Sequence, residues 1–450
     1  MIPTLSVRQR LAPLRFAGTN SCPAVVMIAA MFKTPPPPLA GPDSYDVDDV
    51  AVMLREIGIA LIEVAQPIQV VEARLTDIAD SYTTESVEIA ALPTMLLIQI
   101  GTRAFQLDGS AQPSSQLDMA ARIDQVAGLA QAGAITPTDA IAAVRAARRQ
   151  PPRFGAVATT LGYAVTTVGF GMTIEPSWNA LPAHLFLGLV VGVIMQISRP
   201  LPGFGPILPT LSAVVVTLLA TWFVADVAHD GLLRVISPAL IATLPGMALV
   251  VGAIELAGGK IISGSSRVVY GAAQLGLMVY GVVVGVQIAG QMPTQSPSSP
   301  MGPWSFYVSI AVIAVGLYIY LSAPKGSLIW LLLTIGVAMG AQSVAGLVLN
   351  SAHSGFIGAM VAIPFAMLTA RITTAPPTVV LTLAAFWSLV PGQLTFMSVS
   401  RGATGDYAGL AGVSVAAAAI ISIALGALVG WTLVQTLSSR GRRARITRDD

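Results

Sequence analysis

The dominant feature of this sequence is a series of apolar stretches between Phe154 and Val434, about ten in number, each near the roughly 20 residues that a helix needs to cross a bilayer. Lipid offers backbone N–H and C=O groups no hydrogen-bonding partners, so a chain of this kind crosses it as helices. The composition agrees, with 54% hydrophobic and 10% charged residues, where soluble domains carry about 25% charged residues. The sequence therefore predicts an α-helical polytopic membrane protein.

The charges between the apolar stretches predict the topology. The predicted spans are residues 154–174, 181–198, 207–228, 235–257, 268–290, 304–322, 328–349, 355–370, 378–397 and 409–435. If the basic segment Arg145–Arg153 is cytoplasmic, the outer loops hold only Arg234 and Arg401, as the positive-inside rule requires. We therefore expect ten spans in the cytoplasmic membrane with both termini cytoplasmic. A net charge of +2 is too small to indicate a nucleic-acid partner.

Two predicted spans are interrupted by Pro-Gly pairs, at Pro245-Gly246 and Pro391-Gly392. Each pair falls in the fourth of five spans when the polar, uncharged segment 291–303 is taken as a linker. Five spans per half would invert the second half relative to the first, and broken helices in matching places point to a transporter's substrate site near the midplane. We expect two inverted five-helix repeats, 154–290 and 304–436, and then a basic cytoplasmic tail, 437–450.

Residues 46–150 predict a small cytoplasmic α+β domain. Apolar periodicity and capping residues define its expected elements. They are helices over 50–64 and 70–78, an exposed helix from Ser115, a helix from Pro137 to Arg149 behind the N-cap Thr136, and strands over 86–92 and 95–100. Residues 1–45 hold a short apolar run without a clear cleavage site, so we expect a disordered tail there and not a signal peptide.

The sequence lacks the motifs of ATP-driven transport and of common hydrolases. It contains no Walker loop, no G-x-G-x-x-G, no H-E-x-x-H and no G-x-S-x-G. Cys22 is the only cysteine, and the three histidines, His184, His229 and His353, are not clustered. We therefore expect no disulfide, no metal site and no cofactor. No nucleophile–base pair is legible, so no catalytic residue is assigned and an enzyme is not expected.

The candidates for substrate binding surround the two breaks. Freed N–H groups there can hold a carboxylate, as helix N-termini hold anions, and neighbouring side chains can bind an ammonium or hydroxyl group. The candidates are Thr243, Pro245, Gly246, Met247, Ser388, Pro391, Gly392 and Gln393. The alternative is a pair of simple kinks, because Pro and Gly are common in membrane helices. Gly188 and Gly192 form a Gly-x-x-x-Gly pair, which predicts close helix packing.

Glu255 is the only carboxylate placed within a predicted span. An ionisable group in the membrane is costly and suggests a function. Glu255 is therefore the candidate for binding a coupling proton or the substrate's ammonium group. The alternative is a structural residue that reaches the interface or pairs with Lys260 or Arg267.

Several short motifs carry a resemblance to a known family. They are Pro245-Gly246-Met247, Ala253-Ile254-Glu255-Leu256, Ile262-Ser263-Gly264 and Arg267 around the fourth span, Gly58, Val70, Glu72, Arg74-Leu75, Val87 and Pro93-Thr94 in the N-terminal part, and Val390-Pro391-Gly392. With these, the chain resembles the threonine/serine exporter (ThrE-type) family of bacterial membrane proteins over about residues 46–436. The chain departs from the family at Ala65-Gln66-Pro67, where a glycine is frequent, and its first 45 residues have no counterpart.

The resemblance implies a secondary transporter, an antiporter that exports threonine and serine across the bacterial cytoplasmic membrane with the proton motive force. The implied partners are the small-molecule substrate, protons and the lipid bilayer, and a homo-oligomer stays open. Ser263, Arg267 and Arg371 lie at inner ends of predicted spans and are expected to form the inner mouth. Arg371 also suffices as a topology anchor.

Two other functions stay open. Related two-chain systems are linked to small dicarboxylates such as succinate, although such an exporter should need more fixed positive charge than these spans offer. A membrane-anchored enzyme or regulatory scaffold acting through residues 46–150 is the alternative from another class.

Overall fold

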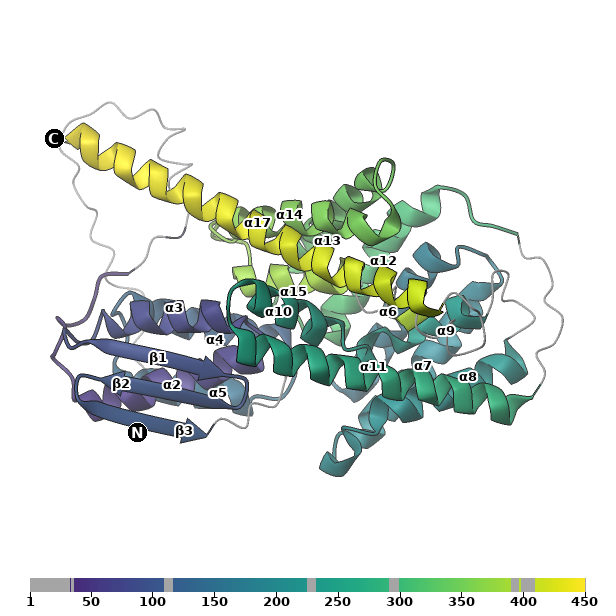
Figure 1. The fold of residues 1–450 in the computed structure, drawn as a ribbon, viewed down its shortest axis with the longest axis horizontal. Coiled ribbons are helices and arrows are strands. Elements are labelled where there is room, and N and C mark those ends of the chain that lie inside the picture. The colour runs from purple at the N-terminus through teal and green to yellow at the C-terminus, as the bar shows by residue number, and fades with distance from the viewer. Residues whose placement is uncertain are drawn as a thin grey trace, which may run out of the picture.

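The structure is a computed structural model, and it describes Lys33 and residues 36–108, 116–224, 232–290, 299–389, 396–397 and 409–449. Its described part is mostly helical, with one small sheet. Figure 1 shows the sheet and its helices at one end of a long helical bundle. The chain therefore has an N-terminal α+β unit and a helical part.

The N-terminal unit combines four helices with a three-stranded antiparallel sheet in the order β1-β2-β3. The elements are α2 (Val47–Glu63), α3 (Ile68–Ala79), β1 (Val87–Leu92), β2 (Met95–Ile100), β3 (Arg103–Asp108), α4 (Leu117–Gln131) and α5 (Pro137–Arg149). The strands are joined by two-residue loops, since Leu92 pairs with Met95 and Ile100 pairs with Arg103. The third strand was not predicted.

Local sequence explains where the helices of this unit begin. The Asp46 side chain accepts a hydrogen bond from the Asp48 N–H at 2.9 Å and so caps α2. Thr136 caps α5 in the same way, with Pro137 in its first turn. On the face of α2 that meets α5, Glu63 accepts a hydrogen bond from Arg148 Nε at 2.8 Å.

Two expectations for the N-terminal part need correction. Helix α4, which was expected to be exposed, buries one whole face, with Leu117, Ile123 and Ala127 fully covered. Part of the predicted tail also packs on the unit. The Asp43 carboxylate accepts a hydrogen bond from the Thr84 N–H at 2.8 Å, and most of residues 1–35 lie outside the described residues.

The described residues of the helical part form eleven helices and two short 3-10 turns. They are α6 (Ala156–Ile174), α7 (Ala180–Ser198), α8 (Leu208–Phe223), α9 (Leu232–Leu240), α10 (Gly246–Ala257), α11 (Ile261–Ala289), α12 (Trp304–Tyr320), α13 (Leu328–Ala345), α14 (Ser351–Thr369), α15 (Thr378–Leu389) and α17 (Gly409–Asp449), where α9 and α10 together make one bent segment.

Six of these helices are long and apolar enough to cross a membrane, or seven if the bent pair α9–α10 is one span. Three shorter apolar helices, α8, α12 and α15, lie at other predicted spans. These lengths agree with a polytopic membrane protein, and the count of ten spans stays a prediction. Helix α17 runs on to Asp449, so residues 437–449 of the predicted tail continue the last helix. Figure 1 shows this end of α17 projecting beyond the bundle.

The two halves of the bundle have several helix contacts in common. The third helix packs on the fifth in each half, α8 on α11 and α14 on α17, and the second and third helices both contact the fourth. Helix α6 of the first half packs on α12 of the second half. The two backbones lie so close that a Cβ added to Gly316 would be 2.5 Å from the Thr166 nitrogen. Glycines therefore let these two helices approach to backbone contact, as membrane helices often do.

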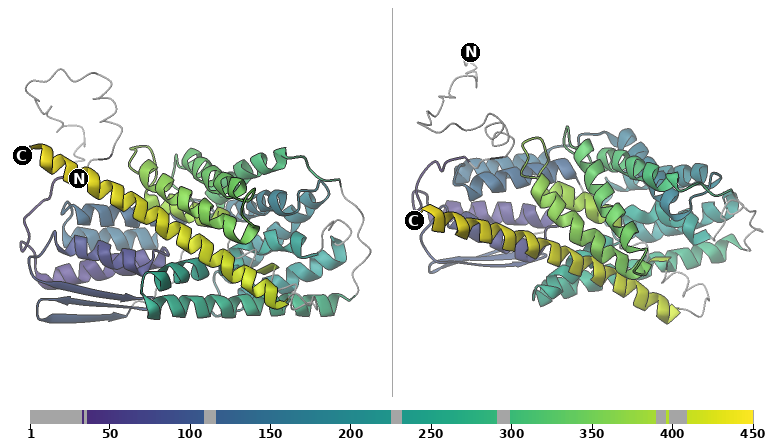
Figure 2. Two further views of the ribbon diagram at one scale, coloured as in Figure 1. Left: turned by 45° about the horizontal axis from the view of Figure 1, so that its top comes forward. Right: turned by 90° about the horizontal axis from the view of Figure 1, so that it is seen from above.

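The N-terminal unit touches three loops at one end of the bundle. Leu117 N–H donates to the Leu321 carbonyl at 2.8 Å, Lys33 N–H donates to the Arg371 carbonyl at 2.9 Å, and Lys260 pairs with Glu72. At the opposite end, the Met301 N–H donates to the Pro176 carbonyl at 2.6 Å. The loops that meet the unit are those that the charge pattern assigns to the inner side. Figure 2 shows the unit against this end in two further views.

Candidate functional site

The predicted break in the fourth span is present. Helix α9 ends at Leu240, a short 3-10 turn covers Ile241–Thr243, and α10 begins at Gly246 with a bend of 66°. Pro245 occupies the N-cap of α10 and, lacking an N–H, cannot continue the ladder from α9. The break therefore follows from the residues that predicted it.

Neighbouring helices satisfy the backbone groups that the break frees. The Tyr163 hydroxyl donates to the Ala239 carbonyl at 2.6 Å and accepts from the Ala242 N–H at 3.3 Å. Gln274 Nε2 donates to the Thr243 carbonyl at 3.3 Å, and the Thr243 hydroxyl bonds to the Leu240 carbonyl. The Thr243 hydroxyl is therefore engaged within its own turn.

The second break lies largely outside the described residues. Pro391, Gly392 and Gln393 fall there, and α15 ends at Leu389. Ser388 is buried, and its hydroxyl donates to the Ala385 carbonyl at 2.8 Å. Ser388 thus points into its own helix.

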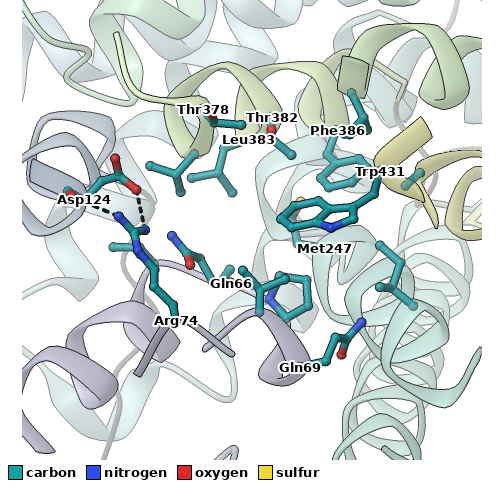
Figure 3. A pocket seen from close by; sticks show the side chains of 18 of the residues that line it. Gln66, Gln69, Arg74, Asp124, Met247, Thr378, Thr382, Leu383, Phe386 and Trp431 are labelled. Atoms are coloured by element: carbon teal, nitrogen blue, oxygen red, sulfur yellow. Dashed lines mark hydrogen bonds and ion pairs between the residues drawn. The ribbon is translucent and has the colours of Figure 1, made fainter. Parts of the chain in front are cut away.

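A cavity of about 190 Å³ lies between the N-terminal unit and the helices beyond the first break (Figure 3). The unit contributes the turn between α2 and α3, three residues of α3 and one of α4. Helices α10, α14, α15 and α17 supply the other wall. The lining residues are Val64, Ala65, Gln66, Pro67, Gln69, Val70, Arg74, Asp124, Met247, Ile254, Ile363, Thr378, Val379, Thr382, Leu383, Phe386, Ala427, Leu428 and Trp431.

The wall from the bundle is mainly apolar, whereas the charges come from the N-terminal unit. Arg74 Nη1 lies 2.5 Å from Asp124 Oδ1, and Arg74 Nη2 donates to the Asp124 carbonyl at 3.1 Å. Figure 3 shows Gln66 beside this pair, with Met247, Phe386 and Trp431 across the cavity. An apolar cavity with a few placed polar groups is typical of a small-molecule site.

Glu255 joins the bundle to the N-terminal unit. Its side chain is fully buried, and it accepts hydrogen bonds from the Ile68 N–H at 3.0 Å and the Ser263 hydroxyl at 2.6 Å. Arg267 Nε lies 3.2 Å from the same carboxylate. Because Ile68 is the first residue of α3, the carboxylate sits at the positive end of that helix. Two of the predicted inner-mouth residues therefore hold Glu255.

The other basic residues near the inner mouth have different partners. Lys260 pairs with Glu72 and not with Glu255, while Glu72 Oε1 also accepts from the Ala91 N–H at 3.0 Å. Arg371 is exposed in the loop before α15 and does not line the cavity of Figure 3.

A second cavity, wide and open at about 950 Å³, adjoins the first. Asp124 and Thr378 line both cavities, so they mark the boundary between them. Its charged lining residues are Lys33, Asp118, Arg122, Asp124, Arg153 and Lys325. Burial lowers the pKa of Lys33, and Asp124 opposes that shift. Burial raises the pKa of Asp118.

The sequence candidates are only partly gathered at this site. Met247 lines the first cavity, and Thr243, Pro245 and Gly246 form the break directly before it. Arg74, Asp124, Gln66 and Tyr163 were not singled out as site residues. Arg74 and Asp124 are 50 positions apart and share no spacing motif, so a sequence pattern could not pair them.

The structure confirms one predicted packing contact and contains one buried carboxylate that was not predicted. Gly188 and Gly192 pack against α6, as predicted, since a Cβ on Gly188 would lie 2.9 Å from the Ala164 Cα. Glu175, the C-cap of α6, is a buried carboxylate of the helical part that sequence reasoning did not assign. Among the described residues, no group of three His, Cys, Asp or Glu side chains could hold a metal ion.

The bundle of membrane-length helices agrees with a polytopic membrane protein, and a bent helix pair beside a cavity is a feature of transporters. The sequence model of one family, ThrE, described as "Putative threonine/serine exporter", matches residues 52–289, which is more than half of the chain. The chain belongs to this family, as its motifs had indicated. Comparison with curated proteins and with solved structures gives no match. Membership of a transporter family is consistent with a protein that is not an enzyme.

Proposed function

We propose that this protein is a secondary exporter of threonine and serine in the bacterial cytoplasmic membrane. The observation that carries the proposal is the cavity at the first break, in a chain that belongs to the threonine/serine exporter family. Substrate enters from the cytoplasm through the wide cavity, reaches the space lined by Met247, and leaves outside when the two halves rock.

The break supplies hydrogen-bond donors to the proposed site. The first N–H groups of α10 lack partners within their own helix, and they point back toward the break. An oxygen atom of the solute near Gly246 would accept hydrogen bonds from these N–H groups and lie at the positive end of the helix dipole. The helix contacts that the two halves have in common support inverted repeats.

We assign proton coupling to Glu255. Its charge is held by Arg267 and by the N-terminus of α3, which belong to different parts of the molecule. Protonation removes that charge and weakens both contacts. A proton and the docked N-terminal unit thus compete for one carboxylate, which links proton movement to opening of the inner mouth.

Counterflow in proteoliposomes tests the proposed function. Vesicles loaded with unlabelled threonine should accumulate labelled threonine or serine from outside, and succinate should not exchange. Protein-free vesicles give the background. Exchange of succinate alone would contradict the substrate assignment, and no exchange by folded protein would contradict transport of these solutes.

One observation favours the second candidate, export of small dicarboxylates. The wide cavity is lined by four basic side chains, Lys33, Arg122, Arg153 and Lys325, and by two carboxylates, Asp118 and Asp124. This surplus of positive charge would attract an anion. The same counterflow experiment separates the two candidates.

A further inference from the structure

The cavity of Figure 3 draws its charged groups from the N-terminal unit and not from the membrane helices. Arg74 lies on α3 and Asp124 on α4, and they are the only charged residues that line it in the part of the chain that the structure describes. Their side chains are 17% and 22% exposed. One positive and one negative group therefore stand side by side at its edge, with no net charge.

Gln66 adds an unused hydrogen-bond acceptor. The residue is 8% exposed, and its Oε1 atom is buried without a hydrogen-bond partner among the described residues. The Oε1 atom of Gln69, which also lines the cavity, is in the same state. Buried polar atoms are nearly always hydrogen-bonded, so an unpaired acceptor in a cavity wall suggests that a ligand supplies the donor.

We propose that the N-terminal unit supplies the polar half of the substrate site and that this half recognises a zwitterion. Arg74 binds the carboxylate of the solute, Asp124 binds its ammonium group, and Gln66 accepts a hydrogen bond from the ammonium or hydroxyl group. The apolar wall around Met247 and Phe386 limits the size of the side chain. This inference rests on the proposed function and narrows its substrate class.

The charges exclude a dicarboxylate from this subsite. A dicarboxylate would place its second carboxylate near Asp124, where like charges repel, and would offer Gln66 no donor. The basic surplus of the wide cavity attracts anionic groups in general, whereas the balanced pair beyond it selects solutes that carry both signs. Because Asp124 lines both cavities, the selection takes place at their boundary.

Binding to the purified full chain in detergent tests the proposal with four probes: threonine, threoninamide, 3-hydroxybutyrate and succinate. Arg74→Gln should weaken threonine about tenfold, the order expected for one charge-assisted contact, and leave threoninamide unchanged. Asp124→Asn should weaken threonine similarly and leave 3-hydroxybutyrate unchanged. Unchanged binding of these partial ligands also shows that each variant is folded.

Arg103→Gln is the matched control, because Arg103 pairs with Asp48 at 3.1 Å on an exposed surface of the same unit. It should bind all probes as the wild type does. Wild-type affinities for threonine in both site variants would overturn the zwitterion subsite and leave the proposed function standing. Tighter binding of succinate than of threonine by the wild type would overturn both.

Discussion

The Glu255 carboxylate is shared between two parts of the molecule, since it contacts the Ile68 N–H of the N-terminal unit and Arg267 of α11. Ile68 and Glu255 are 187 positions apart. Sequence reasoning could place Glu255 in a span and weigh Arg267 as its partner, because both lie in one helical hairpin. It could not find Ile68, because no local pattern links a backbone N–H to so distant a carboxylate.

We expect Glu255→Gln to uncouple transport. Glutamine keeps the size and the acceptor for Ile68 and Ser263 but cannot take up or release a proton. Threonine exchange at equal pH should persist, whereas accumulation driven by a pH gradient should fall at least about tenfold, a change of 1.4 kcal/mol. Glu63→Gln, a carboxylate that is buried against Arg148 within the N-terminal unit, serves as the control. Pumping that survives Glu255→Gln would refute the coupling assignment.

Tyr163→Phe should destabilise the protein, because the Tyr163 hydroxyl bonds to the backbone at the break between α9 and α10. The hydroxyl serves both Ala239 and Ala242, and its loss leaves buried backbone groups unpaired at about 1–3 kcal/mol. Thermal unfolding in detergent should show a lower Tm. Tyr280→Phe is the control, because Tyr280 is 63% exposed on α11. Equal Tm values for the two variants would show that Tyr163 does not support the break.

At the scale of elements, periodicity and capping predicted the helices of the N-terminal unit, and the Pro245-Gly246 pair predicted the first break. Helix α5 begins at Pro137 behind Thr136 as expected, because the cap is a local interaction. Strand β3 was not predicted, although the apolar residues Phe105 and Leu107 are each followed by a polar residue. The buried face of α4 depends on what packs against it, which a sequence pattern does not show.

The crossing of α10 and α11 depends on glycine. A Cβ on Gly264 would lie 2.7 Å from the Gly252 carbonyl oxygen and from the Leu256 nitrogen, both of which are backbone atoms. Gly264→Ala should therefore separate the two helices, cost about 1–3 kcal/mol and reduce transport by displacing Ser263 from Glu255. Gly276→Ala on the same helix meets nothing within 4 Å and should be neutral. Tm and counterflow measured on both variants check this, and a stable, active Gly264→Ala protein would contradict it.

At the scale of the whole molecule, the N-terminal unit covers one end of the bundle and completes the cavity there (Figures 1 and 3). The loops it touches were assigned to the inner side by their charges alone. The positive-inside rule therefore predicts which end the unit occupies, while the cavity between unit and bundle needed the structure.

Labelling of single cysteines tests this orientation. With Cys22, the only cysteine, changed to serine, a membrane-impermeant maleimide should label Trp178→Cys and Trp304→Cys in intact cells. Lys325→Cys should react only after the cells are permeabilised, because we place its loop in the cytoplasm. Labelling of Lys325→Cys in intact cells would invert the topology.

The central claim is that threonine occupies the space between the broken span and the N-terminal unit. The most direct measurement is the rate at which a small thiol reagent modifies Met247→Cys in the same cysteine-free background, in protein that still exchanges threonine. At threonine ten times above its Kd, mass action leaves about one site in ten free, so the rate should fall about tenfold. Gln99→Cys, exposed on β2, should react at a constant rate. A Met247→Cys rate unchanged by saturating threonine would place the substrate elsewhere and contradict the account.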